Sequence, residues 1–140
     1  IIVAGASGAG KTWISNALGV AACNAFYTVR YTRLPELLDE LTVFKDEEWL
    51  KQRKKYIKCD LLIIDDLGTE LVNTFTTSQL FYVVNERLNR KKGTIISTNL
   101  PVNEMRDEFT DRVMSRIISQ YQIIPLYGED IRIRKKLENR

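Results

Sequence analysis

Residues 5–12 read Gly5-Ala6-Ser7-Gly8-Ala9-Gly10-Lys11-Thr12 and match the pattern G-x-x-x-x-G-K-[ST] at every fixed position. The apolar run Ile1–Ala4 precedes the stretch, and Trp13–Leu18 follows it with apolar residues at helical spacing. Strand, glycine-rich loop and helix are the context that the pattern needs, because the curled backbone turns several N–H groups toward one anion. The sequence therefore predicts a phosphate-binding loop over residues 5–13. In such a loop Lys11 reaches the β- and γ-phosphates, and the Thr12 hydroxyl holds Mg²⁺.

The composition is that of one globular domain, which we expect to span residues 1–140. Hydrophobic residues make up 44% of the chain and charged residues 28%, and no apolar run approaches the roughly 18 residues of a membrane span. The net charge of +3 permits a nucleic-acid partner without arguing for one. The chain starts without methionine on its first predicted strand, so we expect an N-terminal partner-binding region to be absent from it.

Some kinds of chemistry are excluded by residues that the chain lacks. It has no histidine, which excludes imidazole catalysis and the Ser-His and Cys-His nucleophile pairs. Its two cysteines, Cys23 and Cys59, have neither zinc-site nor disulfide-framework spacing. They are predicted to be reduced packing residues of a cytoplasmic protein.

Strand-like and helix-like patterns alternate along the rest of the chain. Strands are predicted at 26–31, 60–65, 94–98 and 120–126, the last at a sheet edge because Pro125 cannot donate to a ladder. Helices are predicted at 35–44, 46–56 and 76–91, with further ones from Pro101 and through Ile118. Gly93 is predicted to stop the third of these helices. The alternation predicts a three-layer α/β fold with a five-stranded, mainly parallel sheet. Together with the phosphate-binding loop it predicts a P-loop NTPase.

Polar residues follow two of the predicted strands. Asp65 and Asp66 end the apolar run Leu61–Ile64, and Asn99 follows the run Ile95–Thr98. Ligands of parallel sheets sit at the carboxyl ends of the strands. Asp65 is therefore predicted to hold Mg²⁺, Asp66 to polarise an attacking water, and Asn99 to contact the γ-phosphate or that water. The bland alternatives are a solvated turn for the two acids and a turn-forming role for Asn99.

The order of these motifs resembles that of AAA+ ATPases, and in particular the DnaC/DnaI helicase-loader and IstB transposition-helper group. The stretches 29–34, 62–70 and 94–101 carry the closer resemblance, which spans nearly the whole chain. Residues 111–118 resemble the family's arginine-finger helix, and residues 128–132 resemble its C-terminal element.

The resemblance implies an ATPase core that binds ATP and Mg²⁺ and assembles side by side. Arg116 would then complete the neighbouring subunit's site, and Arg132 would contact nucleotide within its own subunit. The implied partners are single-stranded DNA and a hexameric replicative helicase. Asp66 departs from the pattern, since many relatives have glutamate there.

Several functions remain open from the sequence. The alternatives to the helicase loader are an IstB-like transposition helper and a nucleotide-gated binding module with negligible turnover. A small-molecule P-loop kinase is a further alternative, but the sequence shows no acceptor-binding site for it. DNA contact is expected only from clusters of basic residues. The simpler interpretation of these clusters is that they are solvent-exposed helix faces and a charged tail. The clusters are Arg53, Lys54, Lys55 and Lys58; Arg87, Arg90, Lys91 and Lys92; and Arg132, Arg134, Lys135, Lys136 and Arg140. Trp13, Phe26 and Phe81 lie in patterns typical of a core.

Overall fold

The computed structural model describes residues 1–6, 8–43, 47–68, 74–99, 119–126 and 136–138. Its five strands form one sheet in the order β2-β3-β4-β1-β5, and every pairing is parallel. The strands are β1 (Ile2–Gly5), β2 (Val29–Arg33), β3 (Leu61–Leu67), β4 (Gly93–Thr98) and β5 (Ile123–Leu126). The predicted five-stranded sheet is confirmed, and β5 with Pro125 lies at its edge as expected.

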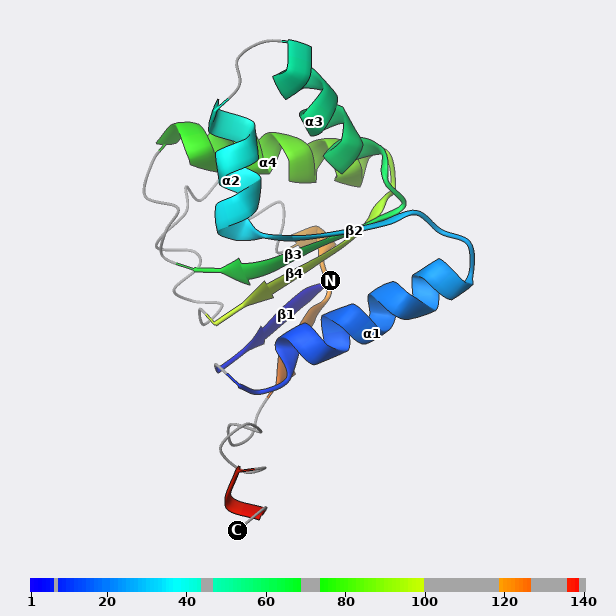
Figure 1. Ribbon diagram of the computed structural model, residues 1–140, viewed down its shortest axis with the longest axis vertical. Helices are drawn as coiled ribbons and strands as arrows, with labels where there is room; N and C mark the ends of the chain where they lie inside the picture. The colour runs from blue at the N-terminus through cyan, green and yellow to red at the C-terminus, as the bar shows by residue number, and fades with distance from the viewer. Residues whose placement is uncertain (7, 44–46, 69–73, 100–118, 127–135, 139–140) are drawn as a thin grey trace.

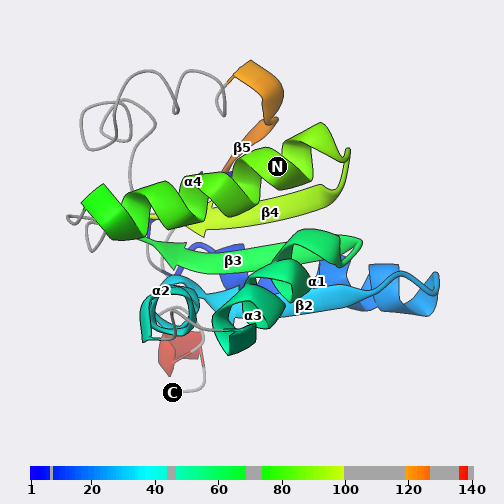
Figure 2. The same cartoon turned by 90° about the horizontal axis from the view of Figure 1, so that it is seen from above.

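Helices cover both faces of this sheet (Figures 1 and 2). They are α1 (Lys11–Asn24), α2 (Leu34–Val43), α3 (Glu47–Lys58) and α4 (Thr74–Asn89). Helix α1 lies on one face, and α2, α3 and α4 lie together on the other, which makes the predicted three layers. No helix among the described residues is both long and apolar enough to cross a membrane.

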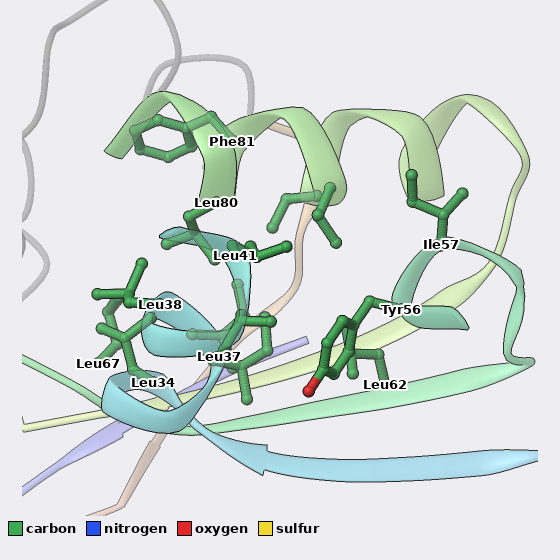
Figure 3. Close-up of a cluster of buried hydrophobic side chains, with 14 of the residues drawn as sticks. Leu34, Leu37, Leu38, Leu41, Tyr56, Ile57, Leu62, Leu67, Leu80 and Phe81 are labelled. Carbon is green, nitrogen blue, oxygen red and sulfur yellow. The ribbon is translucent and has the colours of Figure 1, made fainter. Parts of the chain in front are cut away.

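The main core lies between the sheet and the helices α2, α3 and α4 (Figure 3). Leu34, Leu37 and Leu41 recur at helical spacing along α2 and are fully buried, together with Leu62 and Ile64 of β3. Burying one such side chain contributes about 2 kcal/mol, so this stripe fixes α2 on the sheet. It thereby fixes the end of β2, from which α2 follows directly.

The turn before β2 differs from the prediction. A strand was expected from Phe26, but β2 begins at Val29 because residues 25–28 end helix α1 and turn the chain. Phe26 and Trp13 were expected in the core, yet 97% of Phe26 and 75% of Trp13 is exposed. Phe81 is buried, as expected. Of the two cysteines Cys59 is buried, whereas Cys23 is exposed and does not pack in the core.

The ends of α4 also differ from the prediction. The helix begins at Thr74, two residues before the expected capping box, and ends at Asn89. Gly93 does not stop it: Lys91 adopts a left-handed φ of 56° after its last turn, and Gly93 begins β4. The helices expected from Pro101 and through Ile118 lie outside the described residues.

Arg87 is a buried residue and not part of a DNA-contacting cluster. Its side chain has no exposed surface. Its guanidinium donates to the carbonyl oxygens of Tyr56 (2.7 Å), Cys59 (2.8 Å) and Gly93 (2.7 Å) and to the Thr94 hydroxyl (2.9 Å). Burial lowers the pKa of Arg87, and the neighbouring Cys59 opposes that shift. These bonds tie the end of α3 to α4 and β4.

Candidate nucleotide-binding site

The glycine-rich loop leaves the sheet at the carboxyl end of β1. Gly8 and Gly10 have φ values of 81° and 97°, which L side chains rarely adopt, so glycine is required to curl the loop. Gly5 is required for space, because a Cβ there would lie 2.6 Å from the carbonyl oxygen of Leu126 in β5. The loop then enters α1, with Gly10 as its N-cap.

Lys11 lies across the mouth of this loop. Its Nζ donates to the carbonyl oxygens of Gly5 and Ala6, each at 2.7 Å. The first N–H groups of a helix have no partner within the helix, and the helix dipole adds positive potential there. The loop therefore combines a lysine ammonium with a helix N-terminus, which suits an anion of several charges.

Asp65 is the centre of the polar groups beside the loop. Only 3% of its surface is exposed. One carboxylate oxygen, Oδ2, accepts from the Thr12 hydroxyl (2.9 Å) and the Tyr31 hydroxyl (2.7 Å). The other, Oδ1, accepts from the Ser97 hydroxyl. Four elements, α1, β2, β3 and β4, thus meet at this one carboxylate.

These hydrogen bonds keep Asp65 ionised. Burial alone would raise the pKa of Asp65, but the hydroxyl groups of Ser97, Tyr31 and Thr12 stabilise the charged form, and the pKa falls below its ordinary value. The same arrangement raises the pKa of Tyr31 to about 12, through burial and its bond to Asp65. Asp65 is therefore an anion and Tyr31 a hydrogen-bond donor at neutral pH.

A bulge in β3 separates Asp65 from Asp66. The register with β4 shifts between Ile64 and Leu67, and Asp66 has a left-handed φ of 61°. Asp66 consequently points to solvent while Asp65 stays buried. The Asp66 carboxylate accepts from Nε (3.1 Å) and an Nη atom (2.9 Å) of Arg33, at the end of β2. The Asp66 bond raises the pKa of Arg33.

The other predicted site residues are placed only in part. Asn99 follows β4 directly and is exposed. Ser7, Arg116 and Arg132 lie outside the described residues. The structure thus brings Lys11, Thr12 and Asp65 to one end of the sheet with Asp66, whereas the roles proposed for Asn99, Arg116 and Arg132 stay predictions.

Three polar residues of this site were missed from the sequence: Tyr31, Arg33 and Ser97. Tyr31 lies in the middle of β2 and Arg33 ends it, and Ser97 lies near the end of β4. The Tyr31 and Ser97 hydroxyls reach Asp65, and Arg33 reaches Asp66. The signal was available, because the carboxyl ends of parallel strands share an edge. It could have been used only with the strand order, which places β2 and β4 on either side of β3.

The donors of this site fit a magnesium ion. Thr12 and Asp65 offer hydroxyl and carboxylate oxygens, the ligands that Mg²⁺ prefers. Within the described residues no three acidic or cysteine side chains gather as metal ligands. An ion here would therefore complete its shell with phosphate oxygens and water, as Mg²⁺ does in nucleotide sites.

Comparison with known proteins agrees with this geometry. Residues 1–139 match the family model described as IstB-like ATP binding protein. An insertion sequence ATP-binding protein of Sinorhizobium fredii is 30% identical over 94% of this chain and 56% of that protein. Further relatives come from insertion sequences of Bacillus thuringiensis and Pseudomonas fluorescens, and the chain spans about half the length of these relatives.

Solved structures share the fold. The replication initiator DnaA bound to AMPPCP and single-stranded DNA has a TM-score of 0.82 and 24% identity, over 99% of this chain and 44% of that one. The DnaC helicase loader has a TM-score of 0.81 and 21% identity, over 91% of this chain and 77% of that one. The expected three-layer α/β fold with a five-stranded parallel sheet is thereby confirmed. The family model covers all but one residue of the chain, which therefore belongs to the IstB-like ATP-binding proteins.

Proposed function

We propose that this chain binds ATP together with Mg²⁺ at the loop of residues 5–13 and hydrolyses it. The observation that carries the proposal is the 2.9 Å bond between Thr12 and Asp65, next to the lysine-bearing loop. It joins a helix N-terminus to an ionised carboxylate beside the loop, so these two residues would hold a metal ion that neutralises phosphate charge.

Each residue has a proposed role. Lys11 leaves the carbonyls of Gly5 and Ala6 to bind the β- and γ-phosphates, and Thr12 and Asp65 hold Mg²⁺, which neutralises phosphate charge. Trp13, exposed just after the loop, contacts the nucleotide. Asp66 polarises the attacking water beside Asn99. Arg116 of a neighbouring copy would stabilise charge on the transferring phosphoryl group, with Arg132 acting in the same subunit.

The pairing of Asp66 with Arg33 favours a second possibility. In this arrangement the carboxylate that would activate water is occupied by a guanidinium. A nucleotide-gated binding module with negligible turnover would keep this pair closed in the presence of ATP. Turnover of ATP, measured with and without single-stranded DNA, separates the two: a DNA-stimulated rate supports the ATPase, and binding without any turnover supports the module.

We propose that the biological role is that of a cytoplasmic transposition helper that acts on DNA with a recombinase encoded by the same element. Family membership and the insertion-sequence relatives support this role. The helicase-loader role that the sequence first suggested has support only from the shared fold. Affinity capture of purified candidates decides: ATP-dependent retention of a transposase supports the helper, and retention of a hexameric replicative helicase alone supports the loader.

Assembly of copies through the Arg116 face gives a further test. Arg116→Ala should bind ATP normally but lose stimulated turnover, whereas Lys11→Ala should lose binding. Because each variant keeps the half-site that the other lacks, mixing them should restore some turnover. A mixture that stays inactive in every assembly would exclude the role of Arg116 in a neighbour's site.

A further inference from the structure

Helices α1 and α4 end next to each other in the same hydrogen-bonded motif. At the end of α1, Tyr27 N donates to the Ala22 carbonyl and Phe26 N to the Cys23 carbonyl, each at 3.0 Å. At the end of α4, Lys92 N donates to the Arg87 carbonyl (2.9 Å) and Lys91 N donates to the Leu88 carbonyl (3.1 Å). Both are Schellman motifs, in which the residue after the cap has a positive φ and is usually glycine.

Neither motif has glycine at that position. Phe26 (φ 66°) occupies it after α1 and Lys91 (φ 56°) after α4. Both side chains are exposed, and Phe26 is exposed almost completely. Among the described residues the third non-glycine residue with positive φ is Asp66 of the nucleotide site. Unfavourable backbone conformations of this kind gather at functional sites.

The two helix ends flank one pocket of about 390 Å³. Ala22, Tyr27 and Leu61 line it together with three cationic residues and one acidic residue, which are Arg90, Lys91, Lys92 and Asp60. Its lining residues Leu61 and Gly93 begin β3 and β4. These strands begin at the end of the sheet opposite to the one from which the phosphate loop leaves β1 (Figure 1). The pocket is therefore separate from the nucleotide site.

The charges of the pocket favour an anionic ligand. Lys92 is paired with Asp60 at 3.2 Å, and Arg90 is only loosely paired with Glu86 at 3.8 Å. Lys91 adds an exposed cation. Basic residues also stabilise helix C-termini, so their stabilising role is a competing explanation. That role does not account for the aromatic residues Phe26 and Tyr27, which are 97% and 59% exposed just after α1.

We propose that this pocket binds a segment of single-stranded nucleic acid, with a base stacked on Tyr27 and a backbone phosphate on Arg90 and Lys91. Aromatic rings beside cations are the elements of sequence-independent single-strand binding. The inference rests on the proposed DNA contact and gives that contact a location. The sequence placed Arg87 in a possible DNA-contacting cluster, but Arg87 is buried. The inference assigns the contact to the exposed residues that follow α1 and α4 instead.

The test is fluorescence anisotropy of a labelled oligothymidine of about 16 nucleotides, with ATP affinity measured in parallel. Tyr27→Ala should weaken DNA binding about tenfold, while Tyr27→Phe should bind normally because the ring remains. Lys91→Gly should lower the slope of log K against log salt by about 0.7, the value for one lost phosphate contact on a single strand. ATP affinity should stay unchanged in all three.

Matched control variants show whether the loss of DNA binding is specific to the pocket. Tyr82→Ala removes an exposed ring on α4, and Lys51→Ala removes an exposed lysine on α3. Both should bind DNA like the unaltered chain. Lys91→Gly introduces glycine where φ already suits it, so it folds and carries the test even if Tyr27→Ala does not.

Three outcomes would overturn the inference. DNA affinity that is unchanged in Tyr27→Ala and Lys91→Gly would place the contact elsewhere and leave the proposed DNA contact standing. A chain that binds ATP but no oligothymidine would remove the contact and leave the nucleotide site. If Tyr27→Ala and Lys91→Gly lost affinity for a polyglutamate peptide but bound DNA like the unaltered chain, the pocket would be assigned to an acidic protein partner.

Discussion

Asp65 shows how single residues hold this site together. A carboxylate with 3% exposure keeps its charge because three hydroxyl groups and a neighbouring amide stabilise it. The pKa of Asp65 is therefore lower in the folded chain than in the unfolded chain, where it is about 3.9. The contribution of Asp65 to the free energy of unfolding is fully present above the pKa of the unfolded chain. It is lost as the pH falls through the pKa of the folded chain.

The pH dependence of unfolding tests this arrangement. Asp65→Asn should lower the free energy of unfolding at pH 7 by about 2 kcal/mol, because hydrogen bonds to a charged group are lost. Its stability should also fall less than that of the unaltered chain between about pH 5 and pH 3, since the titrating group is gone. Urea unfolding across this range measures both effects, with Glu48→Gln, an exposed carboxylate of α3, as the control. Parallel pH profiles for the unaltered chain and Asp65→Asn would contradict the assignment.

Phe26 gives a second prediction for a single residue. Its φ of 66° is unfavourable for any residue with a Cβ, and the residue is 97% exposed. Phe26→Gly should therefore raise the free energy of unfolding by about 1 kcal/mol. Ala25→Gly is the control, since φ is −91° there and glycine should destabilise. A destabilised Phe26→Gly would mean that the ring has a structural contact that its exposure does not reveal.

Arg87 acts between secondary-structure elements. Its guanidinium satisfies carbonyl oxygens at the end of α3 and at the start of β4, although the residue itself belongs to α4. Each of these carbonyls would lose its guanidinium donor if the arginine were removed. The helices of this face are thus held by one buried cation as well as by the apolar core.

Substitution of Arg87 should be far more costly than that of its exposed neighbour. Arg87→Met should lower the free energy of unfolding by about 3 kcal/mol, because several buried carbonyls lose their donor. Arg90→Met, three residues on, should change it by no more than about 0.5 kcal/mol. Thermal and urea unfolding of both variants measure the difference. Equal stabilities would show that water or other donors replace the guanidinium without cost.

At the scale of secondary-structure elements, the sequence predicted the helices and strands well and their ends poorly. The stripe of Leu34, Leu37 and Leu41 and the continuous apolar run of β3 determined both elements correctly, because burial requires those periodicities. The ends of α1 and α4 were missed because Phe26 and Lys91 occupy positions that normally carry glycine. Arg87 was misread as a surface cation, since its partners are backbone carbonyls that no sequence pattern marks.

At the scale of the whole molecule, the sheet separates two sites. The carboxyl ends of β1 and β3 carry the loop and Asp65, and the starts of β3 and β4 carry the basic, aromatic pocket. The loop motif predicted that Lys11 and Thr12 lie where a strand passes into a helix, because its spacing is local in sequence. Tyr31, Ser97 and the second pocket depend on strand order and could not be read from the chain alone.

The central claim, that Lys11, Thr12 and Asp65 form one site for ATP and Mg²⁺, is tested most directly by calorimetric titration of ATP into the chain with and without Mg²⁺. We expect saturable binding that Mg²⁺ strengthens, and a loss of at least about tenfold in affinity in Lys11→Ala, because a charge-assisted contact to phosphate is removed. Lys51→Ala, which removes an exposed lysine of α3, should bind like the unaltered chain. Equal affinities in Lys11→Ala and the unaltered chain, or binding indifferent to Mg²⁺, would contradict the account.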